Sequence, residues 1–418
     1  MAGVGPSCPS GPDGAGSGPG ALQHGNCMGF FSLGPGTQSV ELYAPVYPGG
    51  APVSGREKTY WRTYLFAGRL QRGLSAGLCR VRHPVRRVCF LALAGLLSCT
   101  RADHAQNVPL AVQTTAVWEA SPPSAAPMIV ESTPVYAAAT RQLIAFGGRD
   151  RNFDYVGGTW AYDRDSRAWV DLKPAVSPPP RSNHALVYDG SRGTLLLFGG
   201  NGPQRAYNDL WEYDLAQHTW TQLATANPPE ARQMHGMVYD AANQVVLVFG
   251  GRRRDGGAAF ADTWAYDRVA NSWRLLQPEQ APPIQDHANL AYDVKNEVAV
   301  LFSGPDSDTG VGTSTWAYDY RANSWTRLNT DIGPTSDHCG FAYRTGTGRF
   351  TLFGNSAEGD AMETWLFDYA LRDWTRLAVP QAPPYREHFG LAYDPARDIF
   401  VLVGGFPNSD NWVLHLGQ

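Results

Sequence analysis

Short apolar runs that end at glycine, separated by polar turn residues, recur along residues 111–418. In the clearest copy, residues 181–229, the apolar run at residues 195–198 ends on a glycine pair, Trp211 opens a Trp-x-Tyr-Asp sequence, and Trp220 follows nine residues later. Gly, Pro, Asn or Asp bounds each run, which is typical of strands joined by turns rather than of helices. We therefore predict that each copy forms four short strands, which we call a, b, c and d in chain order.

This unit repeats six times with a nearly constant stride. The residue before the glycine pair falls at Phe146, Phe198, Phe249, Phe302, Phe353 and Val403, at intervals of 52, 51, 53, 51 and 50. The first tryptophan of each unit falls at Trp160, Trp211, Trp264, Trp316, Trp365 and Trp412. A period near 50 residues with glycines after an apolar strand is typical of propeller repeats.

The tryptophans also predict how the ring closes. The chain has 13 Trp, and a second repeat tryptophan is present in the first five units but not in the sixth, which ends six residues after Trp412. The missing strand d pattern occurs instead around Trp118, before the first unit. We therefore predict six blades, the last one completed by the strand around Trp118, which leaves few exposed sheet edges.

The Gly-Gly, Tyr and Trp spacing resembles the kelch repeat over residues 111–418. This resemblance implies an all-β fold, a six-bladed kelch-type β-propeller with four-stranded antiparallel blades. Ser303-Gly304 and Gly354-Asn355 depart from the glycine pair, and His415 replaces the usual Asp, so details of those blades are open. Kelch-type copper oxidases need a Cys–Tyr crosslink, and Cys339 is the one cysteine in the repeats, so the resemblance does not lead us to expect a copper cofactor.

Residues 1–110 lack this periodicity. Residues 1–80 are rich in Gly, Ser and Pro, and we expect either a disordered tail or upstream sequence translated in error, with a native start near Val81. Residues 81–99 place arginines before an apolar run and then a small residue and Cys99, which is the order of a secretory signal and is too short to span a bilayer. Residues 100–110 form a polar linker.

The end of this signal, Leu-Leu-Ser-Cys, resembles a bacterial lipobox, which implies lipidation of Cys99. We expect an exported protein of the bacterial outer membrane or periplasm that meets the membrane only through this lipid anchor. Plain secretion with cleavage nearby and a short buried apolar segment are the alternatives. Cys339 would then have no disulfide partner, and we expect it to be a small core residue.

The distribution of charge along the chain restricts the classes of binding partner that we expect. The net charge is −4, but residues 1–98 contain nine Lys/Arg and three Asp/Glu, a net of +6, so the remainder carries −10. A mildly acidic propeller does not favour nonspecific binding to nucleic acid or to anionic membranes. We expect a monomer that binds a protein or glycan ligand and no nucleic acid.

In a four-stranded antiparallel blade the b–c and d–a connections emerge on one face, and the variable b–c loops there are where function concentrates. Arginines from the first three units and acids from units four and five predict a polarised mouth that binds an anionic or polar ligand; ordinary solvated loop charge is the alternative. The candidate ligand-binding residues are Arg149, Arg151, Asn152, Arg181, Asn201, Arg205, Arg232, Arg252, Asp286, Asp306, Asp337 and Arg386.

Histidines recur at the start of strand a in two registers. His184 and His235 lie four residues before the repeat tyrosine, whereas His287, His338 and His388 lie five before it. Because side chains alternate along a strand, the two groups are expected to face opposite sides unless a bulge intervenes, and kelch repeats commonly carry a structural histidine here, so we predict no metal site at these histidines. We also expect no other cofactor and no catalytic residue, since no nucleophile elbow, zinc-protease motif or phosphate loop is present.

These observations favour a non-enzymatic binding or interaction module of the bacterial cell envelope that uses the b–c/d–a face. The alternative is a carbohydrate-active enzyme of the sugar mutarotase or epimerase type, or a carbohydrate-binding protein, on the same face. An enzyme would need an acid/base pair such as Glu387/His388 or Asp337/His338 facing the channel.

Overall fold

The computed structural model describes residues 115–121, 130–163, 166, 168–254, 259–283, 287–304, 313–328, 330, 333–336, 338–356, 359 and 361–417. All of these belong to one compact unit, residues 104–418. The predictions for residues 1–110, including the signal segment and Cys99, lie outside the described residues, as do those for Asp286, Asp306 and Asp337. No helix long and apolar enough to cross a membrane occurs in the described part of the chain.

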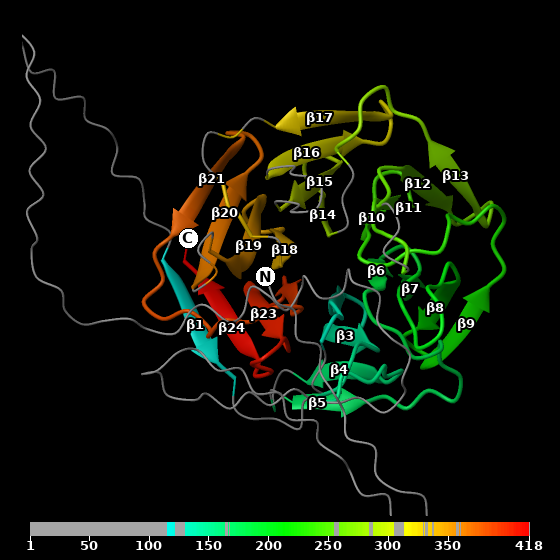
Figure 1. Cartoon of the computed structure of the whole chain (residues 1–418), viewed down its shortest axis with the longest axis horizontal. Helices are drawn as coiled ribbons and strands as arrows, with labels where there is room; N and C mark the ends of the chain where they lie inside the picture. Colours follow the sequence, from blue (N-terminus) through cyan, green and yellow to red (C-terminus); the bar gives the residue numbers. More distant parts are fainter. Residues whose placement is uncertain are drawn as a thin grey trace, which may run out of the picture. The chain divides into compact units, whose positions relative to one another are not determined.

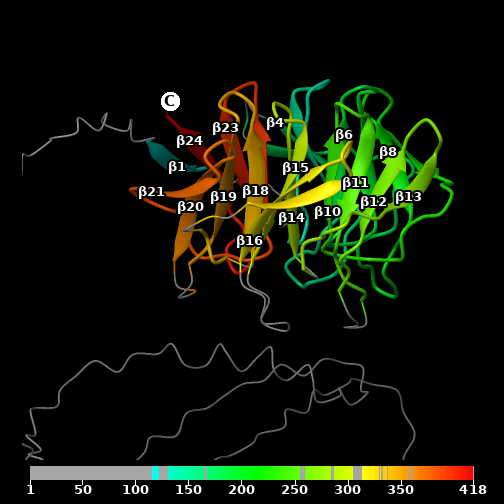
Figure 2. The same cartoon turned by 90° about the horizontal axis from the view of Figure 1, so that it is seen from above.

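The described strands form six four-stranded antiparallel sheets, the blades, arranged around a common centre (Figures 1 and 2). The first three blades are β2 (Val135–Ala137), β3 (Gln142–Phe146), β4 (Thr159–Asp163) and β5 (Ala168–Asp171); β6 (Ala185–Asp189), β7 (Thr194–Phe198), β8 (Leu210–Asp214) and β9 (Thr219–Leu223); and β10 (Gly236–Asp240), β11 (Val245–Phe249), β12 (Thr263–Asp267) and β13 (Ser272–Leu276).

The next two blades are β14 (Ala288–Asp293), β15 (Val298–Ser303), β16 (Ser314–Asp319) and β17 (Ser324–Leu328); and β18 (Cys339–Arg344), β19 (Arg349–Asn355), β20 (Met362–Asp368) and β21 (Asp373–Leu377). The sixth combines both ends of the described chain: β22 (Gly390–Asp394), β23 (Ile399–Val403) and β24 (Trp412–Leu416), with β1 (Ala116–Ala120) as its outer strand.

The closing strand is in the predicted place. β1 pairs antiparallel with β24, with Trp118 opposite Leu414 and Ala120 opposite Trp412. Each innermost strand contacts those of the two neighbouring blades, including β2 with β22 across the closure. The predicted six-bladed propeller closed by its N-terminal strand is therefore confirmed.

The core lies between the blades. Among the described residues there are six clusters of buried apolar side chains, one at each blade interface. The apolar runs of the b strands are buried, as their continuous apolar sequence predicted; Leu195, Leu196 and Leu197 of β7 are all 0% exposed.

Tryptophans of the outer strands tie neighbouring blades together. The indole N–H donates to a threonine hydroxyl at the start of strand c in the preceding blade: Trp220 to Thr159 (2.9 Å), Trp325 to Thr263 (2.9 Å), Trp374 to Thr315 (3.0 Å) and Trp118 to Thr364 (3.0 Å). Leu210 stands at the threonine position facing Trp273, whose buried indole N–H has no partner. The repeat tryptophans are thus core residues, and four of the six interfaces have this hydrogen bond.

Candidate binding face

The b–c and d–a connections meet at one face, where short bridges link them. The residue after each glycine pair forms a bridge with the d–a segment of its own blade: Arg149 with Val130, Asn201 with Ser182, Arg252 with Gln233, and Phe406 with Glu387. Arg149, Asn201, Arg252 and Phe406 are therefore equivalent positions at the bases of four b–c loops. We call the surface made by these loops and segments the loop face.

The glycine pair allows this close approach. Gly199 has φ of 66°, and a Cβ there would lie 2.8 Å from both the carbonyl oxygen of Arg232 and the ring of His235 in the next blade. A positive φ and a neighbouring backbone at this distance both require glycine. The glycine pair that marks the repeat in the sequence thus also lets the b–c loop pack closely against the d–a segment of the next blade.

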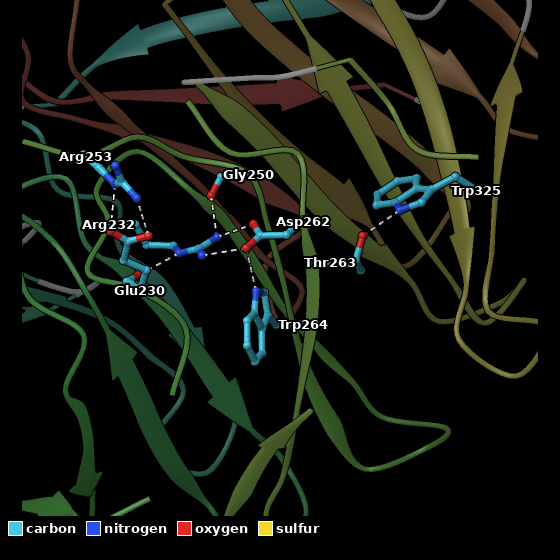
Figure 3. Close-up of polar contacts among 8 residues, drawn as sticks. All are labelled: Glu230, Arg232, Gly250, Arg253, Asp262, Thr263, Trp264 and Trp325. Carbon is cyan, nitrogen blue, oxygen red and sulfur yellow. Dashed lines mark hydrogen bonds and ion pairs between the residues drawn. The ribbon is translucent and has the colours of Figure 1, made fainter. Parts of the chain in front are cut away.

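Three of the predicted ligand-binding arginines are interior residues. Arg181, Arg232 and Arg386 are all 0% exposed. Arg232 forms two hydrogen bonds to the Asp262 carboxylate (2.6 and 2.8 Å), and it donates to the carbonyl oxygens of Gly250 (3.0 Å) and Glu230 (3.1 Å), as Figure 3 shows. Its guanidinium carbon lies 4.2 Å from the centre of the Phe260 ring.

The other two arginines repeat this arrangement. Arg181 pairs with Asp209 and Arg386 with Asp410, and each also donates to the carbonyl of the first glycine of its pair. Because their charged groups are fully engaged and have no exposed surface, these arginines fasten the b–c loops and do not present charge to a ligand. We predicted a surface role for these three arginines. They are buried instead because, in these three blades, an aspartate stands two residues before the strand c tryptophan and pairs with the arginine.

The pairing also sets the charge state of the acids. Burial alone would raise the pKa of Asp262, but hydrogen bonds and charge from Arg232, together with the Trp264 indole N–H (2.7 Å), lower it below its ordinary value. The pKa of Asp209 is lowered in the same way by Arg181. The ion pairs therefore stay formed at neutral pH.

Two other predicted ligand-binding residues, Arg149 and Asn201, lie close together between the first two blades. The Tyr155 hydroxyl accepts hydrogen bonds from Arg149 (2.8 Å) and from the Asn201 side-chain amide (2.9 Å). Arg149 also forms an ion pair with Glu131 (2.7 Å), whose carboxylate accepts from Ser182 (2.6 Å). Tyr155 and Glu131 were not predicted.

The remaining described candidates lie at the surface. Arg151, Asn152 and Arg205 are exposed, and Arg252 is half-buried. The sequence analysis missed an exposed aromatic pair: Phe153, in the b–c loop of the first blade, and Phe406, in that of the sixth, are 40% and 42% exposed. Their ring centroids are 5.1 Å apart, so the two loops contact each other across the closure of the ring.

At the central channel the loop face has a pocket of about 140 Å³. The residue five before each strand a tyrosine borders it in every blade; we call these six the mouth ring: Glu131, Asn183, Met234, His287, His338 and His388. Backbone hydrogen bonds join several of them around the axis, from Glu131 N–H to His388, from Asn183 to Glu131, and from Met234 to Asn183.

The two histidine registers occupy two environments, as their spacing indicated. His184 and His235 are buried with their rings edge-on to Phe146 and Phe198, and burial, with the nearby arginine charges, lowers the pKa of each to about 3. His287, His338 and His388 instead pack against one another. Burial, followed by the influence of His338, lowers the pKa of His388 to about 4.

The fold and this face define a six-bladed β-propeller with a variable loop surface. The chain belongs to the kelch-repeat family: the family model described as KLHDC2/KLHL20/DRC7 Kelch-repeats domain matches residues 109–233 and 223–405. A kelch propeller of this family is a protein-interaction module, which is the general class that the sequence indicated.

Several known proteins are similar to part of this chain. Adagio-like protein 3 of Oryza sativa subsp. japonica is 28% identical over 237 residues, which cover 53% of this chain and 37% of that protein. Adagio protein 3 of Arabidopsis thaliana is 29% identical over 174 residues (40% and 27%), and Acyl-CoA-binding domain-containing protein 5 of the same plant is 26% identical over 185 residues (44% and 27%). The chain thus spans 27–37% of the length of these relatives.

Proposed function

We propose that this chain is a non-enzymatic protein-binding module that uses the loop face, with its strongest contacts on the side where the first and sixth blades meet. The observation that carries this proposal is the Phe153–Phe406 pair. Large aromatic side chains that stay 40–42% exposed while packing on each other offer apolar area at low entropic cost, and aromatic and arginine residues dominate the energetics of protein interfaces.

Two exposed arginines of the loop face favour a partner segment that carries carboxylates. Arg151 is exposed two residues before Phe153, and Arg205 is exposed on the b–c loop of the second blade. Arg252 is half-buried at the base of the third b–c loop, and the guanidinium fork suits carboxylates. We therefore propose a protein segment that combines an apolar or aromatic side chain with Asp or Glu.

A matched pair of variants tests the face. Peptides selected from a display library against the full chain would be titrated against wild type, against Phe153→Ala/Phe406→Ala, and against Val294→Ala/Leu371→Ala. Val294 and Leu371 are 51% and 74% exposed and lie in the a–b and c–d hairpins, which emerge on the opposite face. The aromatic double variant should weaken binding at least tenfold, and the control should not change it.

The result that would count against the proposal is equal binding by wild type and the aromatic variant, or loss in the control alone. A glycan array and a sugar-anomer turnover assay run with the same protein test the carbohydrate alternative. Defined turnover that depends on Glu387 and His388 would replace the proposed function with an enzymatic one.

Export and lipid anchoring form a separate proposal that depends on residues 81–99 alone. We propose that Cys99 is acylated in a bacterial envelope, so that the propeller is held at a membrane surface. One acyl chain gives reversible anchoring, so stable attachment needs more than one. Mass spectrometry of the native N-terminus should find an acylated Cys99; an unmodified N-terminus elsewhere would contradict it.

A further inference from the structure

Three consecutive blades present a histidine at the same position of the mouth ring. His287, His338 and His388 each lie five residues before the strand a tyrosine of blades four, five and six. The ring centroids of His287 and His338 are 5.0 Å apart, and those of His338 and His388 are 4.6 Å apart. The register that separates these three from His184 and His235 is what brings them together.

A carboxylate joins this group from the adjoining d–a segment. One ligand atom from each of His338, Glu387 and His388 lies within 4.8 Å of the other two, and all three side chains are half-buried. His338 and His388 also border the channel pocket. The Tyr385 hydroxyl donates a hydrogen bond to one oxygen of Glu387. Hydrogen bonding of this kind orients a metal-binding carboxylate.

We propose that His338, His388 and Glu387 form a binding site for a divalent transition-metal cation of the Zn²⁺ class. Two imidazoles and one carboxylate suit such cations rather than Mg²⁺ or Ca²⁺, which prefer oxygen ligands alone. Ligand atoms around a tetrahedral zinc lie about 3.3 Å apart, so each atom here would move by less than about 1 Å to bind the ion.

The surrounding groups are compatible with a bound cation. Arg386, next to Glu387 in the chain, forms an ion pair with Asp410 (2.7 Å), and Arg149 forms one with Glu131 (2.7 Å). With three protein ligands, the remaining coordination positions would face the pocket of about 140 Å³ that His338 and His388 border. His287 borders this pocket as well and packs against the His338 ring.

The test is isothermal titration of the chelator-treated full chain with ZnCl₂, and separately with MgCl₂, using wild type and His338→Gln/His388→Gln. Wild type should bind one more Zn²⁺ than the double variant, with a Kd in the micromolar range or tighter, and Mg²⁺ should produce no such difference. Zinc held by cysteines elsewhere in the full chain is the same in both proteins and cancels in this comparison. Substituting one ligand alone should weaken this site by about 100-fold or more.

Two controls separate ligation from a change in the fold. His415→Gln removes a half-exposed histidine that pairs with Glu119 on the outer side of the sixth blade, and Cys339→Ser removes the thiol beside His338. Both should keep the wild-type isotherm, while Glu387→Gln, an isosteric change, should weaken it. Identical Zn²⁺ isotherms for wild type and the double histidine variant, at unchanged thermal midpoints, would overturn the proposal.

Discussion

Arg232 provides the sharpest distinction between a residue that builds the loop face and one that binds a ligand. Arg232→Ala would leave Asp262, whose side chain is 27% exposed, without its ion-pair partner. It would also remove the donors to the carbonyls of Gly250 and Glu230 and the contact with Phe260.

The expected cost follows from this burial. Breaking a buried pair by removing one partner costs about 3–5 kcal/mol, and the partial exposure of Asp262 places the value near the lower end, at about 3 kcal/mol. For a domain of this size that corresponds to a fall in thermal midpoint of roughly 6–10 °C. Arg205→Ala is the matched control, because Arg205 is an exposed arginine on the neighbouring b–c loop; it should stay within about 0.5 kcal/mol of wild type.

The assay is urea denaturation followed by circular dichroism, with peptide binding measured at a temperature where each variant is folded. Folded Arg232→Ala should still bind through the aromatic pair, although its b–c loop is less firmly held. A stability within 0.5 kcal/mol of the Arg205→Ala value would refute the structural role. Complete loss of binding by fully folded Arg232→Ala would show that this side chain contacts the ligand after all.

Three further predictions concern the blade interfaces and the buried histidines. Trp325→Phe should destabilise the fold by about 1 kcal/mol more than Trp273→Phe in urea denaturation, because Trp325 donates to Thr263 while Trp273 has no acceptor; equal costs would contradict this. Thr364→Val at the closure should cost about 1–3 kcal/mol by stranding the Trp118 indole N–H, and Thr364→Ser should cost less. The pKa of His184 and His235 is about 3 in the native state against 6.5 when unfolded, so the unfolded chain binds more protons between these values and stability falls as pH drops below about 6.5. At pH 5 the two histidines together should lower the free energy of unfolding by about 4 kcal/mol. The variant His184→Phe/His235→Phe, which copies Phe389 at the equivalent position, should flatten this dependence of stability on pH. An unchanged dependence would contradict the assignment.

Much of the architecture could be predicted because it depends on residues that recur at a nearly constant interval in the sequence. The stride of the residue before the glycine pair gave six blades, and the displaced tryptophan pattern at Trp118 placed the closing strand on the sixth. These signals are reliable because every blade must fill the same wedge with the same large side chains. Positions that pack identically in each blade therefore reveal themselves by repetition.

The candidate site was less predictable, for two physical reasons. An arginine at a turn between strands usually faces water, and only its aspartate partner shows otherwise. The sequence did contain a signal for that partner, because Arg181, Arg232 and Arg386 each occur together with an Asp two residues before the strand c tryptophan. Where the arginine is absent the aspartate is absent too: blade four has Gln285 and Ser314 at the two positions, and blade five has Ser336 and Glu363. The Phe153–Phe406 contact had none, because it joins loops 253 positions apart that meet only when the ring closes.

The most direct test of the account is a hydrogen–deuterium exchange footprint of the tightest display-selected peptide on the full chain. We expect slower exchange in the b–c loops of the first and sixth blades, residues 149–158 and 404–411, with the a–b and c–d hairpins unchanged. Protection confined to those hairpins would place binding on the opposite face and contradict the account.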